Sequence, residues 1–524
     1  MTPIAITCTL LLAFCIGLLL RRVWSGLDNV PGPPPKSFLT GNLSQFHDAD
    51  GWEFQRELEQ SYGQVVKLHG LLGDRQLFVF DQAALHSILV ENEAAYEDIP
   101  QIMRGFFSAT GNAHRKYRKI LTPAFSTPHL KEMIPLFYEV AERMRDGLIG
   151  PHVVHGPQMV EFTSTLSRTS LELIGRTGIG YSFDPMLPGQ AQTDRYAQAL
   201  KRTVFRMALL IPFMHFVVKM IPFPSFLRSM IHFVPIPALH EARDIIDLMD
   251  AAAAQLVKDR KNVLEGEDPD TDAKDVMSLL MKSNINAGTE MHLTDEELVA
   301  STSMIVFAAT DTTSAALNRT LYILATHPDV QDKLRAEILA APEHLDHAML
   351  NALPYLDAVL HEVLRLYPPV APVLYREAIR DTTLPLSTPI IGVDGTPMHT
   401  ITVPKGTSIL IATAAANRCQ QVWGEDALKF RPERWESGKA DTIVGGTKMC
   451  GIYGGTMTFL GGARGCIGFR FAQLELKVVL CVLLRAFKLS NPDPRVEWRK
   501  PDVIPCPTID NQPQLPIFVE RLCP

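Results

Sequence analysis

The stretch FLGGARGCIG, from Phe459 to Gly468, decides the fold of this chain of 524 residues. It presents Cys466 on a glycine-rich loop just before Phe469 to Phe487, a run with leucines and valines at helical spacing. Free N–H groups and the dipole at a helix N-terminus stabilise an anion and lower the pKa of a thiol. The glycines can bring N–H donors close to the sulfur and to a flat partner, while Phe459 can shield it from water. The pattern therefore favours a thiolate metal ligand at Cys466, with a free buried cysteine in a tight turn as the alternative.

A helical pattern opens after Thr294 and continues to Thr326, a length of about 50 Å. A capping box begins it and His327-Pro328 ends it. Its apolar middle is interrupted by a polar cluster, Ala308 to Thr313. Threonine and aspartate side chains compete for backbone hydrogen bonds, so we expect the helix to be loosened locally, with room for water. A buried polar kink without a catalytic role is the alternative.

Two downstream segments carry charges that can meet in the fold. A helix after Pro354 places Glu362 and Arg365 at i,i+3 spacing on one face, and the segment Phe430 to Trp435 supplies Arg434. Alone, a Glu-x-x-Arg pair is a common surface feature.

Along the chain, the polar cluster, the Glu-x-x-Arg helix, the Pro-Glu-Arg-Trp segment and the cysteine loop follow one another in the order typical of the cytochrome P-450 superfamily. The chain resembles that family over essentially its whole length. The resemblance implies a mainly α fold with a small β-region, haem b with Cys466 as the axial iron ligand, and monooxygenase activity. It also implies a set of haem-contacting residues: Cys466, Phe459, Gly462, Arg464, Gly468, His114, Arg118 and Arg376.

The resemblance implies catalytic roles for Thr312, next to bound dioxygen, and for Asp311, in proton supply. It also joins Glu362, Arg365 and Arg434 in a buried structural network. The chain departs from the family pattern in three places: His114 replaces the usual tryptophan, Ala309 replaces the usual glycine, and Trp435 stands where phenylalanine is common.

The N-terminus predicts a membrane anchor. Residues 4–20 are uncharged and apolar, and Arg21-Arg22 follow directly, so the positive-inside rule keeps the following chain in the cytosol. A cleaved signal peptide would place its positive charge before the apolar run. We expect a signal anchor over residues 1–22, a proline-rich hinge over 23–36 and a catalytic domain over 37–524, in the endoplasmic reticulum membrane as a single-pass protein.

Composition narrows the function classes. A hydrophobic content of 46% is ample for a large core, and a net charge of −7 without a basic run gives no support to nucleic-acid binding. The eight cysteines show no C-x-x-C spacing, which fits a reduced compartment.

The implied partners are a separate NADPH-cytochrome reductase in the same membrane, with cytochrome b5 as a further candidate, an apolar small-molecule substrate and membrane lipid. The apolar, proline-broken run from Phe205 to Val234 fits lipid contact or adaptable binding of such a substrate. The wording around the cysteine loop resembles fungal microsomal members, which favours terpenoid-like substrates in secondary metabolism.

Two other functions stay open at this point. One is a haem-thiolate isomerase or dehydratase that needs no reductase; such members tend to lose the Asp-Thr pair, which this chain keeps. The other is a non-catalytic haem-binding or lipid-binding membrane protein.

Overall fold

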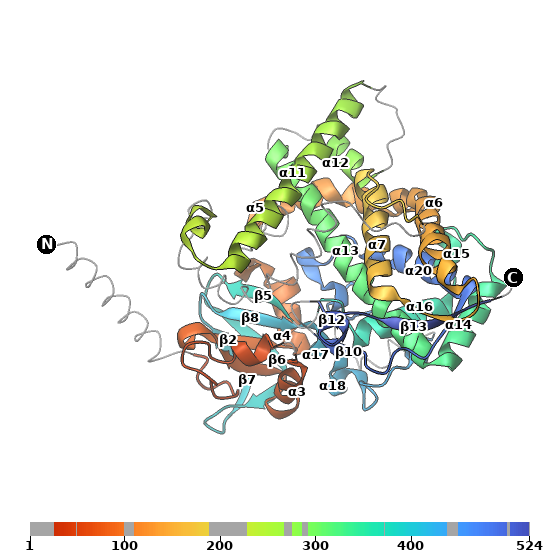
Figure 1. Ribbon diagram of the computed structural model, residues 1–524. Coiled ribbons are helices and arrows are strands. Elements are labelled where there is room, and N and C mark those ends of the chain that lie inside the picture. The colour runs from red at the N-terminus through yellow and green to blue at the C-terminus, as the bar shows by residue number, and fades with distance from the viewer. Residues whose placement is uncertain are drawn as a thin grey trace.

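The computed structural model describes residues 26–48, 50–98, 109–187, 228–266, 275–285, 292–370, 373–436, 449–499 and 504–522. Helices fill the upper and right parts of Figure 1, and most strands gather at its lower left, so the chain is mainly α with a smaller β-region. The predicted anchor over residues 1–22 and most of the run from Phe205 to Val234 lie outside the described residues. Within the described part of the chain, no helix combines the length and apolar composition that a membrane span needs.

The helical part is built from long and short α-helices that follow the apolar periodicity of the sequence. The described helices are α2 (Leu43–Phe46), α3 (Trp52–Ser61), α4 (Gln82–His86), α5 (Gly111–Leu121), α6 (Thr127–Arg143), α7 (Phe162–Ile174), α11 (Pro237–Gly266), α12 (Val276–Ile285), α13 (Asp295–Thr326), α14 (Pro328–Ala340), α15 (His347–Asn351), α16 (Pro354–Leu366), α17 (Thr413–Arg418), α18 (Gln420–Trp423) and α20 (Phe469–Ala486).

The strands of the described residues form four small sheets. Their bounds are β1 (Val65–His69), β2 (Arg75–Val79), β3 (Tyr96–Asp98), β4 (Gln158–Glu161), β5 (Val373–Ala378), β6 (Thr382–Ile391), β7 (Pro397–Val403), β8 (Ser408–Ala412), β9 (Phe487–Ser490), β10 (Glu497–Arg499), β11 (Cys506–Ile509), β12 (Gln512–Pro513) and β13 (Pro516–Arg521). The largest sheet has the order β1-β2-β8-β5-β3, in which β2 and β8 are parallel and the other neighbours antiparallel. The three-stranded sheets are β10-β11-β12 and β4-β13-β9, and β6 pairs with β7.

Several expectations for local structure are confirmed. The sequence pattern predicts a helical stretch around Trp52 to Tyr62, and α3 follows it. Alternation over Val65 to His69 and Gln76 to Phe80 predicts a β-hairpin, which β1 and β2 form as an antiparallel pair with the second strand one residue earlier. The segment Tyr96 to Phe107 was expected to be a loop, and its first three residues are instead strand β3, because they pair with β5 at the sheet edge. Residues 99–108 lie outside the described residues.

Helix α13 runs through the middle of the helical part (Figure 1). Its capping box is present: the Thr294 hydroxyl accepts from the backbone N–H of Glu297, whose carboxylate accepts from the N–H of Thr294. Helix α13 is continuous across Ala308 to Thr313, so it is not broken there, and the expected loosening stays a prediction. The Thr312 hydroxyl donates to the carbonyl of Ala308 at 2.8 Å, and such a bond to the residue four positions earlier often bends a helix.

Two apolar cores hold this architecture together. One lies among α6, α7, α13, α16 and α20, and the other packs under the β1-β2-β8 sheet and includes the fully buried Trp423. Phe459 packs against the first core and Leu460 belongs to the second. The cysteine loop therefore lies where the helical core and the sheet core meet.

Candidate active site

The cysteine loop, residues 459–468, is closed by its own backbone hydrogen bonds. The N–H of Cys466 donates to the carbonyl of Phe459 at 2.9 Å, and the N–H of Gly465 donates to that of Gly462 at 3.1 Å. Gly468 is the N-cap residue of α20, so Cys466 lies at the N-terminus of a helix, as the sequence pattern predicts.

Close contacts with the backbone of other segments explain why two positions of the loop are glycine. Gly462 has a φ of +66°, and a Cβ there would lie 1.8 Å from the carbonyl oxygen of Leu89. A Cβ on Gly461 would lie 1.9 Å from the carbonyl oxygen of Cys450. Gly468 differs, because its Cβ would meet its nearest neighbour at an ordinary 3.7 Å. Close backbone approach thus requires glycine at 461 and 462, whereas packing within the described chain permits a side chain at 468.

The Cys466 sulfur is in an environment that suits a thiolate ligand. Burial raises the pKa of the thiol and outweighs the backbone N–H of Gly468 and the guanidinium of Arg118, which act in the opposite direction, so the lowered pKa expected at a helix N-terminus is wrong. The side chain is nevertheless accessible. An accessible sulfur with an N–H donor and a nearby cation is the arrangement that metal binding needs.

Three arginines gather beside the loop. Arg118, on α5, donates from Nη1 to the carbonyl of Gly465 at 2.7 Å. Arg464 and Arg376 both form ion pairs with Asp98, the former over 2.8 Å between Nη1 and Oδ2. Asp98 offsets only part of this positive charge, so the cluster suits a group with two carboxylates, such as the two propionates of haem.

His114 lies within this cluster, and the positive charge of the arginines affects its pKa. Burial is the main cause that lowers its pKa to about 4, and Arg464, Arg118 and Arg376 add electrostatic repulsion of the imidazolium. His114 is therefore neutral near pH 7 and can donate one hydrogen bond. The cluster brings together four of the predicted haem-contacting residues from α5, β5 and the cysteine loop.

The middle of α13 presents the predicted oxygen-activating residues. Asp311 and Thr312 are both partly exposed, whereas Thr310 and Thr313 on neighbouring faces are buried. The methyl group of Ala309, where the family usually has glycine, is accommodated in an unbroken helix. The catalytic roles of Asp311 and Thr312 stay predictions.

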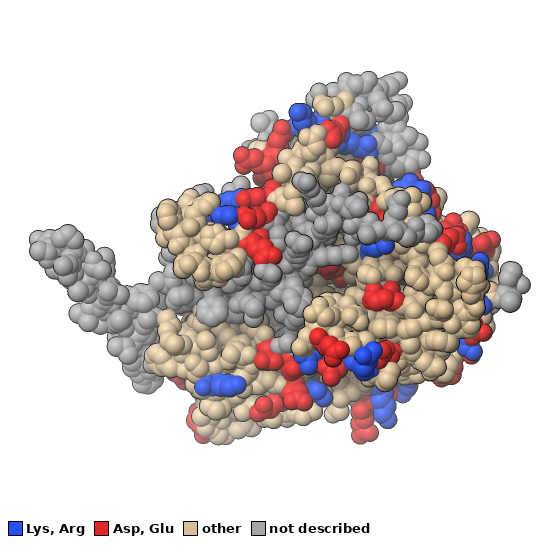
Figure 2. All heavy atoms as spheres, viewed as in Figure 1, with Lys and Arg blue, Asp and Glu red and all other residues tan. Residues whose placement is uncertain are grey.

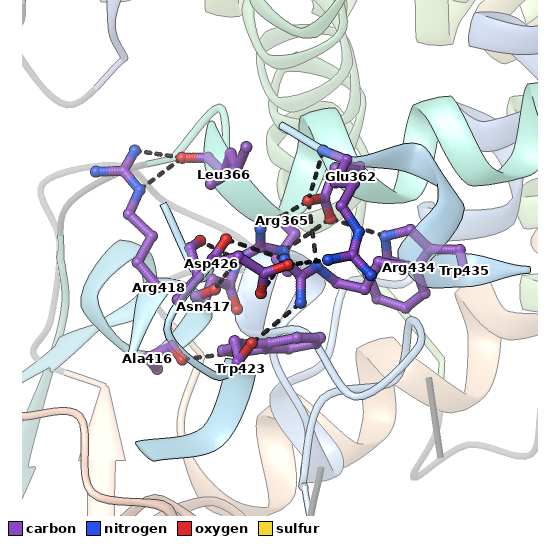
Figure 3. Close-up of polar contacts among 12 residues, drawn as sticks. Glu362, Arg365, Leu366, Ala416, Asn417, Arg418, Trp423, Asp426, Arg434 and Trp435 are labelled. Carbon is purple, nitrogen blue, oxygen red and sulfur yellow. Dashed lines mark hydrogen bonds and ion pairs between the residues drawn. The ribbon is translucent and has the colours of Figure 1, made fainter. Parts of the chain in front are cut away.

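The structure brings Glu362, Arg365 and Arg434 into one buried network (Figure 3). Glu362 and Arg365 are fully buried and Arg434 is 1% exposed. Arg365 makes a bidentate pair with Glu362, with both N–O distances at 2.8 Å, and Nε of Arg434 lies 3.3 Å from Glu362 Oε1. Such a pair combines charge with fixed geometry, so it holds α16 against the segment that follows α18.

Two members of this network were not predicted from the sequence. Trp435 donates from Nε1 to Glu362 Oε2 at 2.9 Å, and Asp426 Oδ1 lies 2.9 Å from Nη2 of Arg434 (Figure 3). The indole N–H of tryptophan can donate a hydrogen bond and phenylalanine cannot, which explains why tryptophan suits position 435. No sequence motif pointed to Asp426.

Asn417, which is fully buried at the end of α17, ties the network to the cysteine loop and was also missed. Its backbone carbonyl accepts from Arg365 at 2.8 Å. Its side chain accepts from the N–H of Met457 at 2.6 Å and donates to the hydroxyl of Thr458 at 2.9 Å. Met457 and Thr458 directly precede Phe459, so Asn417 connects the buried charge network to the cysteine loop.

A row of rings forms a second connection between network and loop. The Trp435 ring lies 4.7 Å from that of His361, which stacks on Tyr453 at 3.8 Å and 18°. Tyr453 in turn meets Phe459 edge to face at 5.4 Å. Gly454 has a φ of +54° and faces Trp435 closely enough that a Cβ would lie 2.8 Å from it. We call these four rings and Gly454 the aromatic row.

A mainly helical fold, an accessible cysteine at a helix N-terminus and a cation cluster beside it are the features of a haem-thiolate protein. The cytochrome P450 family model matches residues 31–507. The chain is 41% identical to cytochrome P450 monooxygenase 91 of Postia placenta, over 96% of this chain and 97% of that protein. It is 41% identical to monooxygenase 81 of the same fungus, over 97% of this chain and 96% of that protein. It is 36% identical to a ganoderic acid synthetase of Ganoderma lucidum, over 97% of each.

The chain therefore belongs to the cytochrome P450 family, and it is an oxidoreductase enzyme with the P450 fold. Enzymes of this family act on small molecules and use haem b, which activates dioxygen with electrons that a reductase draws from NADPH. The accessible Cys466 and the excess positive charge of the arginine cluster fit that cofactor.

Proposed function

We propose that this protein is a membrane-anchored haem-thiolate monooxygenase that inserts one oxygen atom of O2 into an apolar substrate. The observation that carries the proposal is the accessible Cys466 at the N-terminus of α20 with the arginine cluster beside it. A cysteine ligand donates electron density that favours cleavage of the O–O bond. The chain keeps Asp311 and Thr312, which supports oxygen insertion over a rearrangement that needs no external electrons.

Each predicted residue has a role in this proposal. Cys466 would bind the haem iron and Phe459 would shield the sulfur from water, while Gly462 shapes the loop and Gly468 would let the backbone come close to the haem. Arg118, Arg376 and Arg464 bind the haem carboxylates, and His114 donates a further hydrogen bond to them. Thr312 and Asp311 hold and supply protons on the opposite side.

The proposal places the catalytic domain, residues 37–524, on the cytosolic face of the endoplasmic reticulum membrane, behind the anchor 1–22 and the hinge 23–36. The apolar run over residues 4–20 supports this. So do large apolar side chains on the surface: Phe38 and Leu39 are each 61% exposed and Phe233 is 80% exposed. The electron donor would then be an NADPH-cytochrome reductase in the same membrane, with cytochrome b5 as a second donor.

For the substrate we propose a terpenoid-like compound of fungal secondary metabolism. The similarity to a relative named ganoderic acid synthetase supports a role in making fungal metabolites.

The central test is the absorption spectrum of the reduced, carbon-monoxide-bound protein beside that of Cys466→Ala. A strongly red-shifted Soret band that only the unmutated protein shows is the expected result. A spectrum that is indifferent to Cys466 in folded protein would refute the thiolate site.

Turnover gives the second test. Membranes that contain the protein and reductase should convert an apolar substrate into a product with one oxygen atom from isotopically labelled dioxygen, and only with NADPH. A rearranged product formed without NADPH would favour an isomerase. Deletion of residues 1–22 should release the protein from membranes and leave the carbon monoxide spectrum intact.

A further inference from the structure

Glu475, in the second turn of α20, is a fully buried glutamate that the proposed function does not use. Both of its carboxylate oxygens lack a hydrogen-bond partner among the described residues. Leaving a buried polar group unpaired is costly, and a buried unpaired charge is more costly still. The carboxyl at this position therefore needs an explanation.

The side chain that faces Glu475 is Thr313 on α13, whose hydroxyl interacts with the carboxyl without ideal hydrogen-bond geometry. The hydroxyls around Thr313 are engaged elsewhere. Thr310 and Thr312 donate to the carbonyls four residues earlier, and Ser314 donates to the carbonyl of Asp311. Thr313, also buried, is thus the member of the polar cluster that faces α20.

The protonation state of Glu475 follows from what surrounds it. Burial raises its pKa well above the ordinary value, and only the Thr313 hydroxyl opposes the shift; no basic side chain contributes. A carboxyl in such a place takes up a proton instead of remaining charged. A neutral carboxyl can accept a hydrogen bond from Thr313 through one oxygen and donate through the other to a buried water.

Glu172, on α7, is a comparison: burial raises its pKa as well, but three hydrogen-bond donors within the chain oppose that shift. It is equally buried, but its carboxylate accepts from the Ser182 hydroxyl at 2.7 Å and from the N–H groups of Phe183 and Asp184 at 2.8 and 2.9 Å. Glu172 has a complete set of donors within the chain. Glu475 has none.

We propose that Glu475 is a positioning residue, a neutral carboxylic acid on α20 that binds the Thr313 hydroxyl and so fixes the turn of α13 that presents Asp311 and Thr312. The inference rests on the proposed function, because it takes Asp311 and Thr312 as the residues to be positioned. Small displacements of reacting groups have large effects on rate, and this is the physical reason for such a clamp. Glu475 lies nine positions after Cys466 and acts from the neighbouring helix.

The first test is infrared spectroscopy of the purified holoenzyme, and it does not depend on turnover. The difference between the unmutated protein and Glu475→Gln should contain the C=O band of a protonated carboxyl at neutral pH. Thr313→Val should shift this band, because the hydrogen bond to the carboxyl is lost. A carboxylate band at this position, or a carboxyl band that Thr313→Val leaves unmoved, would overturn the proposal.

The second test measures coupling, as the share of NADPH electrons that ends in hydrogen peroxide. Glu475→Gln keeps a group that can hydrogen-bond to Thr313, so the share should stay near that of the unmutated enzyme, whereas Glu475→Leu should raise it severalfold. Glu172→Gln is the matched control for a buried glutamate elsewhere and should leave the share unchanged. Equal uncoupling in Glu475→Gln and Glu475→Leu would overturn a role through hydrogen bonding.

The two proposals can fail separately. If Cys466 proves not to ligate haem, the proposed function fails whatever the infrared band shows. If the carbon monoxide spectrum is as expected but Glu475 is ionised, only the positioning role fails.

Discussion

Glu362 and Glu475 are both completely buried glutamates, yet their surroundings differ in every other respect. Glu362 Oε1 accepts from Arg365, Arg434 and the N–H of Arg431, and its Oε2 accepts from Arg365 and Trp435. Both oxygens of Glu475 lack such partners among the described residues. Burial alone therefore does not decide whether a carboxyl is charged, because partners within hydrogen-bond distance decide it.

The two sites also differ in what they hold. Glu362 connects α16 to the segment after α18, and Asn417 and the aromatic row continue that connection to the cysteine loop. Glu475 faces a single hydroxyl of α13. Many hydrogen bonds and ion pairs thus hold α16 to the segment after α18 at Glu362, a connection that we call the stiff support. The contact between α20 and α13 at Glu475 consists of few interactions, and the following variants test how much the Glu362 connection contributes.

The largest effect is expected for Glu362→Gln. The variant leaves Arg365 and Arg434 buried without their counter-charge, which should lower the free energy of unfolding by about 3–5 kcal/mol and reduce haem content. Chemical unfolding and haem content per chain measure both effects. Arg143→Ala is the control: it breaks a surface pair with Glu139, 42% and 39% exposed, and should cost less than about 1 kcal/mol. Equal losses in the two variants would contradict the stiff support.

Asn417→Ala should come next, with a loss of about 2–3 kcal/mol, because it leaves the N–H of Met457 and the hydroxyl of Thr458 without their partner. Thr458→Val removes only the hydroxyl, which also donates to the carbonyl of Leu364 at 2.7 Å, and should cost about 1 kcal/mol. Thermal unfolding of both variants compares them. If Thr458→Val cost more than Asn417→Ala, the Met457 contact would not matter.

Gly454→Ala should cost about 2 kcal/mol and disturb the aromatic row, since it combines a positive φ with a Cβ 2.8 Å from the Trp435 ring. Gly395→Ala isolates the backbone contribution. Gly395 has a φ of +81° and no atom within 4 Å of its Cβ position, so only about 1 kcal/mol of strain is expected. Denaturant unfolding and near-ultraviolet circular dichroism would separate the two. An equal loss of stability in Gly454→Ala and Gly395→Ala would show that the contact with the aromatic row adds nothing.

The smallest effect concerns pH and His114. Its pKa is about 4 in the folded chain against an ordinary value of 6.5, so between these values the unfolded chain binds a proton that the folded chain does not. The stability that the neutral His114 contributes is fully present above pH 6.5 and is lost as the pH falls towards 4. Relative to His114→Gln, the protein should lose about 1 kcal/mol between pH 7 and pH 5.5, measured by thermal unfolding. Bound carboxylates would weaken the effect, so haem-depleted protein should show it more strongly. Parallel pH curves for the two proteins would contradict the lowered pKa.

Features that depend on neighbouring residues could be predicted well from the sequence. The bounds of α13 follow from its capping box and from Pro328, and the β1-β2 hairpin follows from alternation around a turn. The short spacing from Cys466 to the start of α20 placed the sulfur at a helix N-terminus. Each of these rests on covalent spacing and on the backbone hydrogen bonds that such spacing allows.

Contacts between distant segments that no family motif carries were beyond sequence reasoning. Asp98 meets Arg376 and Arg464 only because β3 pairs with β5. Asn417 reaches the cysteine loop across forty residues of chain.

By itself, the sequence determined the family-type motifs, the mainly helical character, the cysteine at a helix N-terminus and the three charges of the Glu362 network. The tertiary structure alone decided which of the buried carboxyls find donors, why glycine is required at 461, 462 and 454, and how the network reaches the loop. The physical reason is that local order depends on neighbours along the chain, whereas charge state and close packing depend on whatever the fold brings alongside.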